Sequence, residues 1–125
     1  MSSYEKIVAK LLSQAKIRYQ QEKSFKDLKG GLFRFDFYIP DLHGGRVIIE
    51  VDGEYHFHPI RGRALFLKTQ GHDRRKNSYC LANNIPLYRI PYWEVKNLQS
   101  AADCFQKKFL VDSKWWNDNL EVPKR

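Results

Sequence analysis

The sequence is poor in cysteine and has no long apolar run. Its two cysteines, Cys80 and Cys104, are too few and too far apart for a disulfide framework or a paired-cysteine metal site, so we expect buried thiols. No apolar run approaches the ~18 residues of a membrane span. The N-terminus also lacks the apolar stretch of a signal peptide. We therefore expect a cytoplasmic protein with no membrane partner.

Acidic residues are outnumbered by basic ones. The chain has 22 Lys and Arg against 14 Asp and Glu, a formal net charge of +8 and an isoelectric point near 9.6. A small basic protein favours polyanionic partners, because each phosphate that it neutralises releases counterions. The basic residues are scattered and do not line one long amphipathic helix, so nucleic acid is favoured over a membrane surface. A basic surface with no specific partner is the alternative.

Length and composition indicate one folded domain over residues 1–125. A chain of this size holds one core, and the 42% hydrophobic and 14% aromatic content is typical of a globular protein. A capping box at Ser2 and Glu5, followed by apolar residues at helical spacing, predicts a helix over residues 3–17. A short strand is expected over 17–22, and a loop then ends at Gly30 and Gly31.

Two aromatic and β-branched segments predict a hairpin. We expect strands over residues 32–39 and 46–51, joined by a five-residue turn over 41–45. A long connection over 53–71 follows, then a helix over 72–84, a strand over 85–91 and a last helix that begins at Ser100. The predicted order is α-β-β-β-α-β-α, which indicates an α/β sandwich with a mixed β-sheet flanked by helices.

Three acidic residues interrupt the apolar hairpin. Glu50 and Asp52 share one face of their strand, because side chains alternate along a strand, and Asp36 lies at a similar level in the preceding strand. Each acid taken alone is explained more simply by a solvent-facing strand end. Three acids together favour a hard divalent cation, because charges inside a sheet are costly unless they are paired or hold a metal. We therefore expect Asp36, Glu50 and Asp52 to bind metal.

Six short segments carry a pattern in a fixed order: Tyr4–Lys6, Phe35–Phe37, Val47–Glu50, Val51–His56, His72–Asn77 and Pro86–Glu94. This pattern resembles the core of the very-short-patch repair endonucleases and of the phage homing endonucleases described by the signature EDxHD. Both belong to the PD-(D/E)xK nuclease superfamily. The resemblance covers residues 3 to 95 and implies a restriction-endonuclease-like fold.

The signature letters fall on Glu5, Asp36, Glu50, His56 and Asp73. The resemblance implies that Asp36 is the central metal ligand and that Glu50 supplies a second ligand. It also implies that His56 is the base toward the attacking water and that Asp73 orients its imidazole. Glu5 would reach the metal through water, although the capping box gives Glu5 a purely structural alternative, and both interpretations stay open.

Two positions depart from the family pattern. Glu50 stands where the repair enzymes have a threonine, and Asp52 stands where the superfamily usually has a lysine. The second departure weakens a lysine-based mechanism and increases the importance of His56. The structural zinc ligands of the repair enzymes are missing, so we expect Mg²⁺, with Mn²⁺ as a substitute, and no zinc.

Basic residues of the long connection and the following helix are candidates for phosphate contacts: Arg61, Arg63, Lys68, Arg74, Arg75 and Lys76. For each of them a solvated surface position is the alternative. His58 is expected to contact phosphate or solvent. We expect Trp93, Trp115 and Trp116 to pack in the core or in a lid.

Together these features predict a Mg²⁺-dependent DNA endonuclease that nicks or cuts duplex DNA in a repair, homing or phage setting. A junction-resolving nuclease and a catalytically silent nucleic-acid-binding module with the same fold are the alternatives. The partner is DNA. The sequence does not decide between a monomer and a homodimer.

Overall fold

A four-stranded mixed sheet forms the centre of the computed structural model, which describes residues 1–125. The strands, in sheet order, are β1 (Gln20–Ser24), β2 (Arg34–Leu42), β3 (Gly45–Asp52) and β4 (Leu87–Pro91). The β1–β2 and β2–β3 pairs are antiparallel, whereas β3 and β4 are parallel. All four strands lie within a few residues of the predicted ranges.

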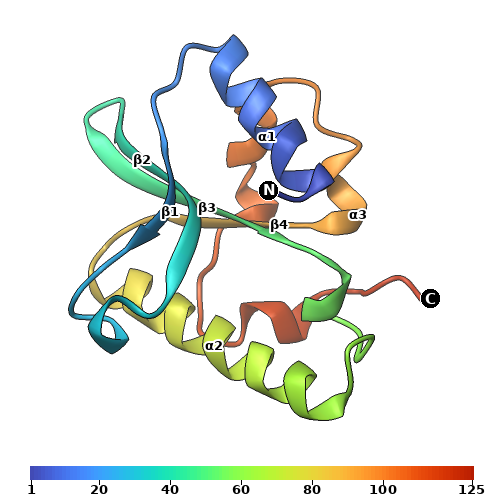
Figure 1. The fold of residues 1–125 in the computed structure, drawn as a ribbon. Coiled ribbons are helices and arrows are strands. Elements are labelled where there is room, and N and C mark those ends of the chain that lie inside the picture. The colour runs from blue at the N-terminus through green and yellow to red at the C-terminus, as the bar shows by residue number, and fades with distance from the viewer.

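Helices cover both faces of this sheet. Helices α1 (Ser3–Gln14) and α3 (Tyr92–Val95) lie on one face, and α2 (Arg63–Ala82) lies on the other (Figure 1). The predicted α/β fold, a mixed sheet flanked by helices, is therefore confirmed. No helix combines the length and the apolar character needed to cross a membrane.

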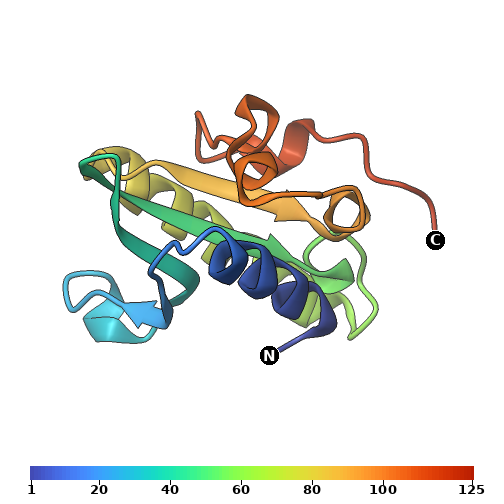
Figure 2. The ribbon, with the colours of Figure 1, turned by 90° about the horizontal axis from the view of Figure 1, so that it is seen from above.

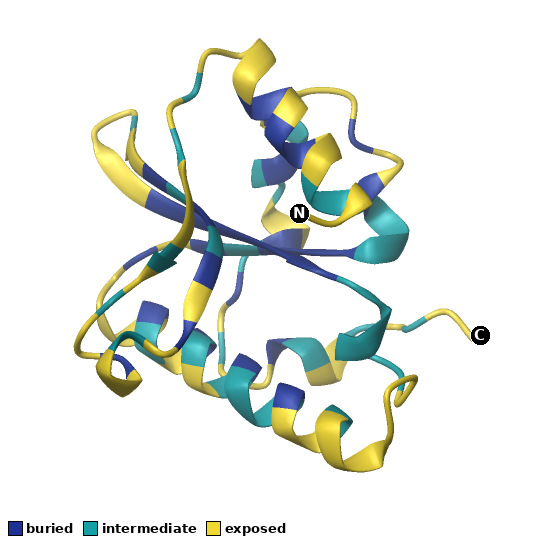
Figure 3. Ribbon diagram, in the orientation of Figure 1, coloured by how far each residue is buried: buried dark blue, intermediate teal, exposed yellow.

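Strand β3 runs through the middle of the molecule and is buried on both sides (Figure 3). Val47, Ile49 and Val51 pack in a hydrophobic cluster with α1, α3 and the segment after α3, whereas Ile48 packs in a second cluster with α2. Because side chains alternate along a strand, Glu50 and Asp52 share the face of Ile48 and point toward α2.

Helix α2 is much longer than the sequence pattern predicts. It begins at Arg63, where we expected a loop up to Gly71 and a helix only from residue 72. The first eight residues are mostly good helix formers, and Gly71 lies inside the helix, where a single glycine costs only ~1 kcal/mol relative to alanine. The prediction that the helix begins only after Gly71 was therefore wrong. The actual break is Gly62, which has φ +98°.

The hairpin turn is shorter than predicted. Leu42 pairs with Gly45, so His43 and Gly44 form a two-residue turn, and the expected five-residue turn was wrong. Both turn residues have positive φ, 53° and 91°, as the favoured hairpin turns require. The Asp41 carboxylate accepts a hydrogen bond of 2.8 Å from the Gly44 amide.

Two helix limits also differ from the prediction. Helix α1 ends at Gln14 rather than residue 17, because the chain turns toward β1 through Lys16, whose φ is +60°. The helix expected from Ser100 is a 3₁₀ helix, Ala101–Phe105, with a capping box between Ser100 and Asp103. Two further 3₁₀ helices, Lys107–Phe109 and Trp116–Asn119, follow along the β4 edge of the sheet (Figure 2).

Both cysteines are free and buried, as expected. Burial raises the pKa of each thiol to about 12, so neither is a reactive thiolate near neutral pH. Trp93 packs edge-on against Phe57, and Trp116 is buried in the cluster beside α2. Trp115 differs from these two, because 46% of it is exposed.

Candidate functional site

Strands β2 and β3 separate at Asp36. Their regular pairing ends at Phe37 and Ile49, and beyond this point the Val51 amide donates a hydrogen bond of 2.8 Å to Asp36 Oδ2. Phe35 packs on the α2 side of the sheet, whereas Phe37 packs on the α1 side, so β2 turns at Asp36. The Val51 amide is therefore bonded to the Asp36 side chain and not to the β2 backbone. The carboxylate lies where the two strands diverge.

Glu50 lies beside Asp36 and faces a cation from α2. Lys76 Nζ is 2.9 Å from Glu50 Oε1 and also donates a hydrogen bond to the Arg34 carbonyl at 2.5 Å. Burial alone would raise the pKa of Glu50, but the charges of Lys76 and Arg89 outweigh burial and lower it. Burial would lower the pKa of Lys76, and the Glu50 charge outweighs burial and raises it. Both groups are therefore charged.

Asp36 lacks such a partner. Burial and the neighbouring charge of Glu50 raise the pKa of Asp36 to about 10, and the hydrogen bond from Val51 offsets only part of this effect. A carboxyl group with this pKa carries a proton at neutral pH. Asp36 thus lies where carboxyl groups are crowded, and no lysine or arginine forms an ion pair with it.

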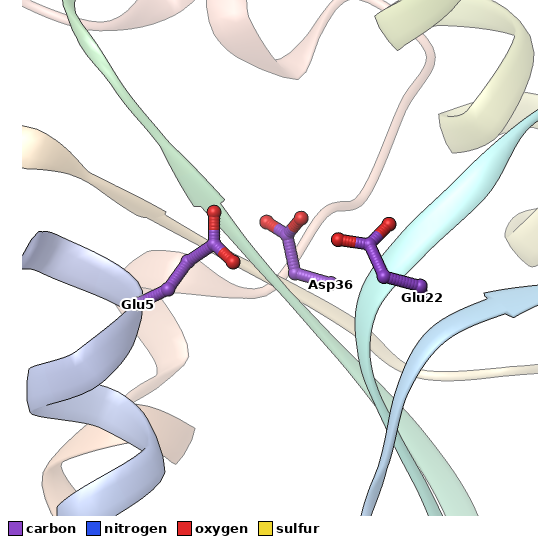
Figure 4. Close-up of side chains that lie close together, drawn as sticks. All are labelled: Glu5, Glu22 and Asp36. Carbon is purple, nitrogen blue, oxygen red and sulfur yellow. The ribbon is translucent and has the colours of Figure 1, made fainter. Parts of the chain in front are cut away.

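Two more carboxylates lie close to Asp36, which stands between them. Glu5 of α1 and Glu22 of β1 each bring an oxygen within 4.8 Å of the others and of Asp36 (Figure 4). Glu22 has φ +56° and lies opposite Asp36, where the β1–β2 register skips a pair. Glu22 was not predicted from the sequence, because it lies in a uniformly polar strand that gives no contrast between its two faces.

Glu5 belongs both to the cap of α1 and to the acidic group around Asp36. Ser2 Oγ accepts a hydrogen bond from the Glu5 amide at 3.1 Å, which confirms Ser2 as the cap of α1, and its hydroxyl lies 3.4 Å from Glu5 Oε1. The same carboxylate reaches the Asp36 group. Capping and a place in the acidic group are compatible, and a catalytic role for Glu5 stays a prediction.

His56, in the segment after β3, and Asp73 of α2 form a second pair. His56 Nδ1 lies 2.8 Å from Asp73 Oδ2, as the predicted roles require. Asp73 is buried in the middle of α2 and does not open a helix, contrary to our expectation. Burial would lower the pKa of His56, but the charge of Asp52 and the contact with Asp73 outweigh burial and raise it.

Asp52 is not brought to the acidic group. It is fully buried, and Arg89 Nη1 donates to both of its oxygens at 2.9 and 3.0 Å. His56 Nδ1 is 3.8 Å from Asp52 Oδ1. An arginine that occupies both carboxylate oxygens satisfies the charge of Asp52 without a metal.

A basic cleft opens next to this site. It has a volume of about 460 Å³, and His56 and Asp73 form part of its wall. Its basic side chains are Lys29, Arg34, Lys68, His72, Arg75 and Lys76. Three of the predicted phosphate contacts, Lys68, Arg75 and Lys76, therefore share one surface, and Lys29 and Arg34 were not anticipated.

The other predicted phosphate contacts lie outside the cleft. Arg74 stacks on Trp115 at 4.6 Å and pairs with Asp118 at 3.3 Å. Arg61 lies over the Tyr55 ring at 4.7 Å, and Arg63 is exposed at the start of α2. The side chain of His58 is 3.0 Å from the Pro123 carbonyl oxygen.

The donor set around Asp36 consists of oxygens. Asp36 lies close to Glu50, Glu5 and Glu22, and hard divalent cations such as Mg²⁺ prefer oxygen ligands. The neighbouring His56–Asp73 pair adds a group that can accept a proton, and the cleft adds a basic surface that can meet anions. Comparison with protein-family models, curated proteins and solved structures found no match to this chain.

Proposed function

We propose that this protein is a metal-dependent DNA endonuclease whose centre is Asp36. The observation that carries the proposal is the group of carboxyl oxygens at Asp36, where Glu5 and Glu22 lie within 4.8 Å. Burial and the charge of the neighbouring Glu50 raise the pKa of Asp36 to about 10. A divalent cation would relieve this crowding, because a positive charge next to a carboxyl group favours its ionised form.

Asp36 and Glu50 are the ligands that we propose for Mg²⁺ or Mn²⁺. Glu5 and Glu22 are close enough to Asp36 to contribute directly or through water. Asp52 is left out of the proposed ligand set, because Arg89 holds both of its oxygens. When bound, a divalent cation would polarise the scissile phosphate and stabilise charge on the departing oxygen.

The proposed base is His56. The contact between Nδ1 and Asp73 fixes the ring, so that Nε2 of the neutral imidazole is the nitrogen that accepts a proton from the attacking water. Lys76 holds the Glu50 carboxylate and lines the cleft, where its ammonium can also meet a phosphate oxygen. These contacts support a division of roles in which Lys76 binds and His56 moves the proton.

The basic cleft supports DNA as the substrate. Its cations lie within one surface beside His56, so a phosphate chain held there would pass the proposed base. A module that only binds DNA would gain nothing from a cluster of carboxyl groups around Asp36, because carboxylates repel phosphate unless a cation intervenes. A cytoplasmic location is compatible with a DNA substrate, and it stays a prediction.

Digestion of supercoiled plasmid tests this proposal. We expect nicked or linear product with Mg²⁺ or Mn²⁺ and none in excess EDTA. Asp36→Asn, which keeps the size of the side chain but not its charge, should reduce cleavage at least 10²-fold, roughly the contribution of one essential catalytic group. Asp112→Asn is the matched control, because Asp112 is exposed and makes no hydrogen bond or ion pair.

Parallel digestions of branched DNA and of RNA separate the alternatives. A strong preference for branched DNA would indicate a junction-resolving enzyme, and cleavage of RNA alone would contradict the DNA substrate. Plasmid cleavage that persists in EDTA, or at the parental rate in Asp36→Asn, would contradict the proposed site. Binding without cleavage under all metal conditions would support the silent module.

A further inference from the structure

Arg89 of β4 is the centre of a buried polar network beside the His56–Asp73 pair. Its side chain is fully buried. Beyond its two bonds to Asp52, Nε donates to Asn77 Oδ1 at 2.7 Å, and Nη2 donates to the Asp73 backbone carbonyl at 3.4 Å. The guanidinium thus uses three nitrogens to join β3, β4 and α2.

Both carboxylates that flank His56 are tied to this guanidinium. Asp73 holds His56 Nδ1 at 2.8 Å, and its other oxygen, Oδ1, is 3.5 Å from Arg89 Nη2. Asp52 lies 3.8 Å from the same Nδ1, and both of its oxygens accept hydrogen bonds from Arg89. A shift of Arg89 would therefore move both neighbours of the imidazole.

The C-terminal segment completes the network. Asn117 Nδ2 donates to Asp52 Oδ2 at 3.4 Å, and Asn77 Nδ2 donates to the Lys114 carbonyl at 3.1 Å. Segments far apart in the sequence therefore meet at Arg89. Side chains of β3, α2 and the 3₁₀ helix Trp116–Asn119 thus meet around the Arg89 side chain of β4.

Stability alone is a poor explanation for these buried charges. The desolvation of an ion pair offsets much of its attraction, and apolar residues of similar volume often hold a core as well or better. We propose that Arg89 is a positioning residue that aligns the His56–Asp73 pair through Asp52 and through the Asp73 backbone. This inference rests on the proposed function, because it assigns His56 as the base.

The charges around His56 are consistent with this role. Asp52 faces the ring from β3, Asp73 faces it from α2, and Arg89 lies behind both from β4. The two carboxylates carry one more negative charge than the single guanidinium neutralises. This remaining charge lies next to Nδ1, so a proton gained at Nε2 is stabilised. Loss of the network should therefore alter both the rate and its pH dependence.

A double variant separates positioning from folding. Asp52→Leu/Arg89→Met replaces the ion pair by apolar side chains and avoids a lone buried charge, which a single replacement would leave. The matched control is Glu94→Gln/Lys108→Gln, which removes an ion pair of 3.1 Å outside the site. Arg89→Lys keeps the positive charge but loses the planar guanidinium, which bonds several partners at once. If the double variant does not fold, this single variant tests the positioning role.

We expect the folded double variant to cleave plasmid 10- to 100-fold more slowly, the range typical of lost support behind a catalytic group, and to show a shifted pH–rate profile. Arg89→Lys should be about 10-fold slower on the same grounds. The control should keep the parental rate. A folded double variant, or Arg89→Lys if only that variant folds, with the parental rate and profile would overturn the inference.

A second readout does not depend on cleavage. In the parent, the Nδ1 proton shared with Asp73 should give a protected, downfield NMR signal, and this signal should be lost in the double variant and weakened in Arg89→Lys. A variant that retains the parental signal and the parental His56 titration would overturn the positioning role. If the parent cleaves no DNA, the proposed function fails, and the signal alone decides whether Arg89 orders the pair.

Discussion

Asp36 and Glu50 lie next to each other in the sheet, but their surroundings move their pKa values in opposite directions. Glu50 has the Lys76 ammonium at 2.9 Å, and its pKa is lowered. Asp36 has a backbone amide and further carboxylates, and its pKa is raised to about 10. Two similar groups thus have different protonation states at neutral pH because only one of them has a cation.

This difference predicts proton release on metal binding. The Asp36 carboxyl is protonated below its pKa of about 10, whereas a metal ligand must be ionised, so Mg²⁺ should displace about one proton near pH 7. The affinity for Mg²⁺ should therefore rise with pH through the neutral range. Calorimetry in buffers with different ionisation enthalpies measures the number of protons released. Asp36→Asn should abolish the release, and a parent that releases none would contradict the prediction.

His56 should control the pH dependence of cleavage. His56→Ala should slow cleavage on the order of 10²–10⁴-fold with little change in metal affinity, and Asp73→Asn should show a smaller loss of the same kind. The pKa of His56 is raised, and only the neutral ring accepts a proton, so the parental rate should increase with pH through a range above the usual histidine value. Rates measured across pH with His58→Ala as the neighbouring control test this. A His56→Ala variant with the parental rate and profile would leave Lys76 or a metal-bound hydroxide as the better candidate.

At the scale of the element, helix α2 carries much of the site. Asp73, Lys76 and Asn77 all project from it toward the sheet, and Lys68 and Arg75 line the cleft. The sheet-facing side of this helix is therefore mostly polar, because much of it meets Glu50, Asp52 and Arg89, and only its C-terminal part, at Cys80, joins a hydrophobic cluster. Such a helix lacks the apolar stripe that identifies most helices from sequence.

The middle of α2 offers a test of this element. Gly71 lies within the helix with no atom near the position of a Cβ, so Gly71→Ala should raise the free energy of unfolding by about 0.5–1 kcal/mol. Gly62→Ala should lower it instead, because Gly62 has φ +98°. Urea denaturation followed by circular dichroism compares the two variants. Equal effects would contradict a continuous helix that begins after Gly62.

At the scale of the whole molecule, charge is unevenly distributed. The net charge of +8 includes a row of cations in the cleft, and the acidic group around Asp36 lies close to it. An anionic polymer would be attracted by the cleft and held near a point that repels phosphate. A cation bound at the acidic group would remove the repulsion between this group and a phosphate held in the cleft.

DNA binding should therefore weaken steeply with salt. Each phosphate contact contributes about 0.9 to the slope of log affinity against log salt on duplex DNA, so Lys68→Gln and Arg75→Gln should each reduce the slope by about this amount. Lys10→Gln is the control, because Lys10 is exposed on α1 across the sheet. Fluorescence anisotropy at several salt concentrations gives the slope. A slope near zero in the parent would show that the basic charge is incidental.

Local signals in the sequence predicted much of the molecule. Alternating aromatic and β-branched residues identified β2 and β3, and the capping residues at Ser2 identified α1. The order of the short motifs led to Asp36, Glu50, His56 and Asp73, and the contact between His56 and Asp73 agrees with the predicted pairing. These features depend on neighbours along the chain or on residue types that are costly to bury.

Only the tertiary structure decided the partners of these residues. Asp52 has the same sequence signal as Glu50, yet Arg89 of β4 neutralises the first and Lys76 of α2 neutralises the second. Glu22 joins Asp36 through a skipped pair between β1 and β2, whereas Lys29 reaches the cleft from the segment before β2 and Arg34 from the start of β2. The sequence determined which groups are present and on which strand face they lie. The electrostatic state of each group depends on charges brought from distant segments, which only the packed fold specifies.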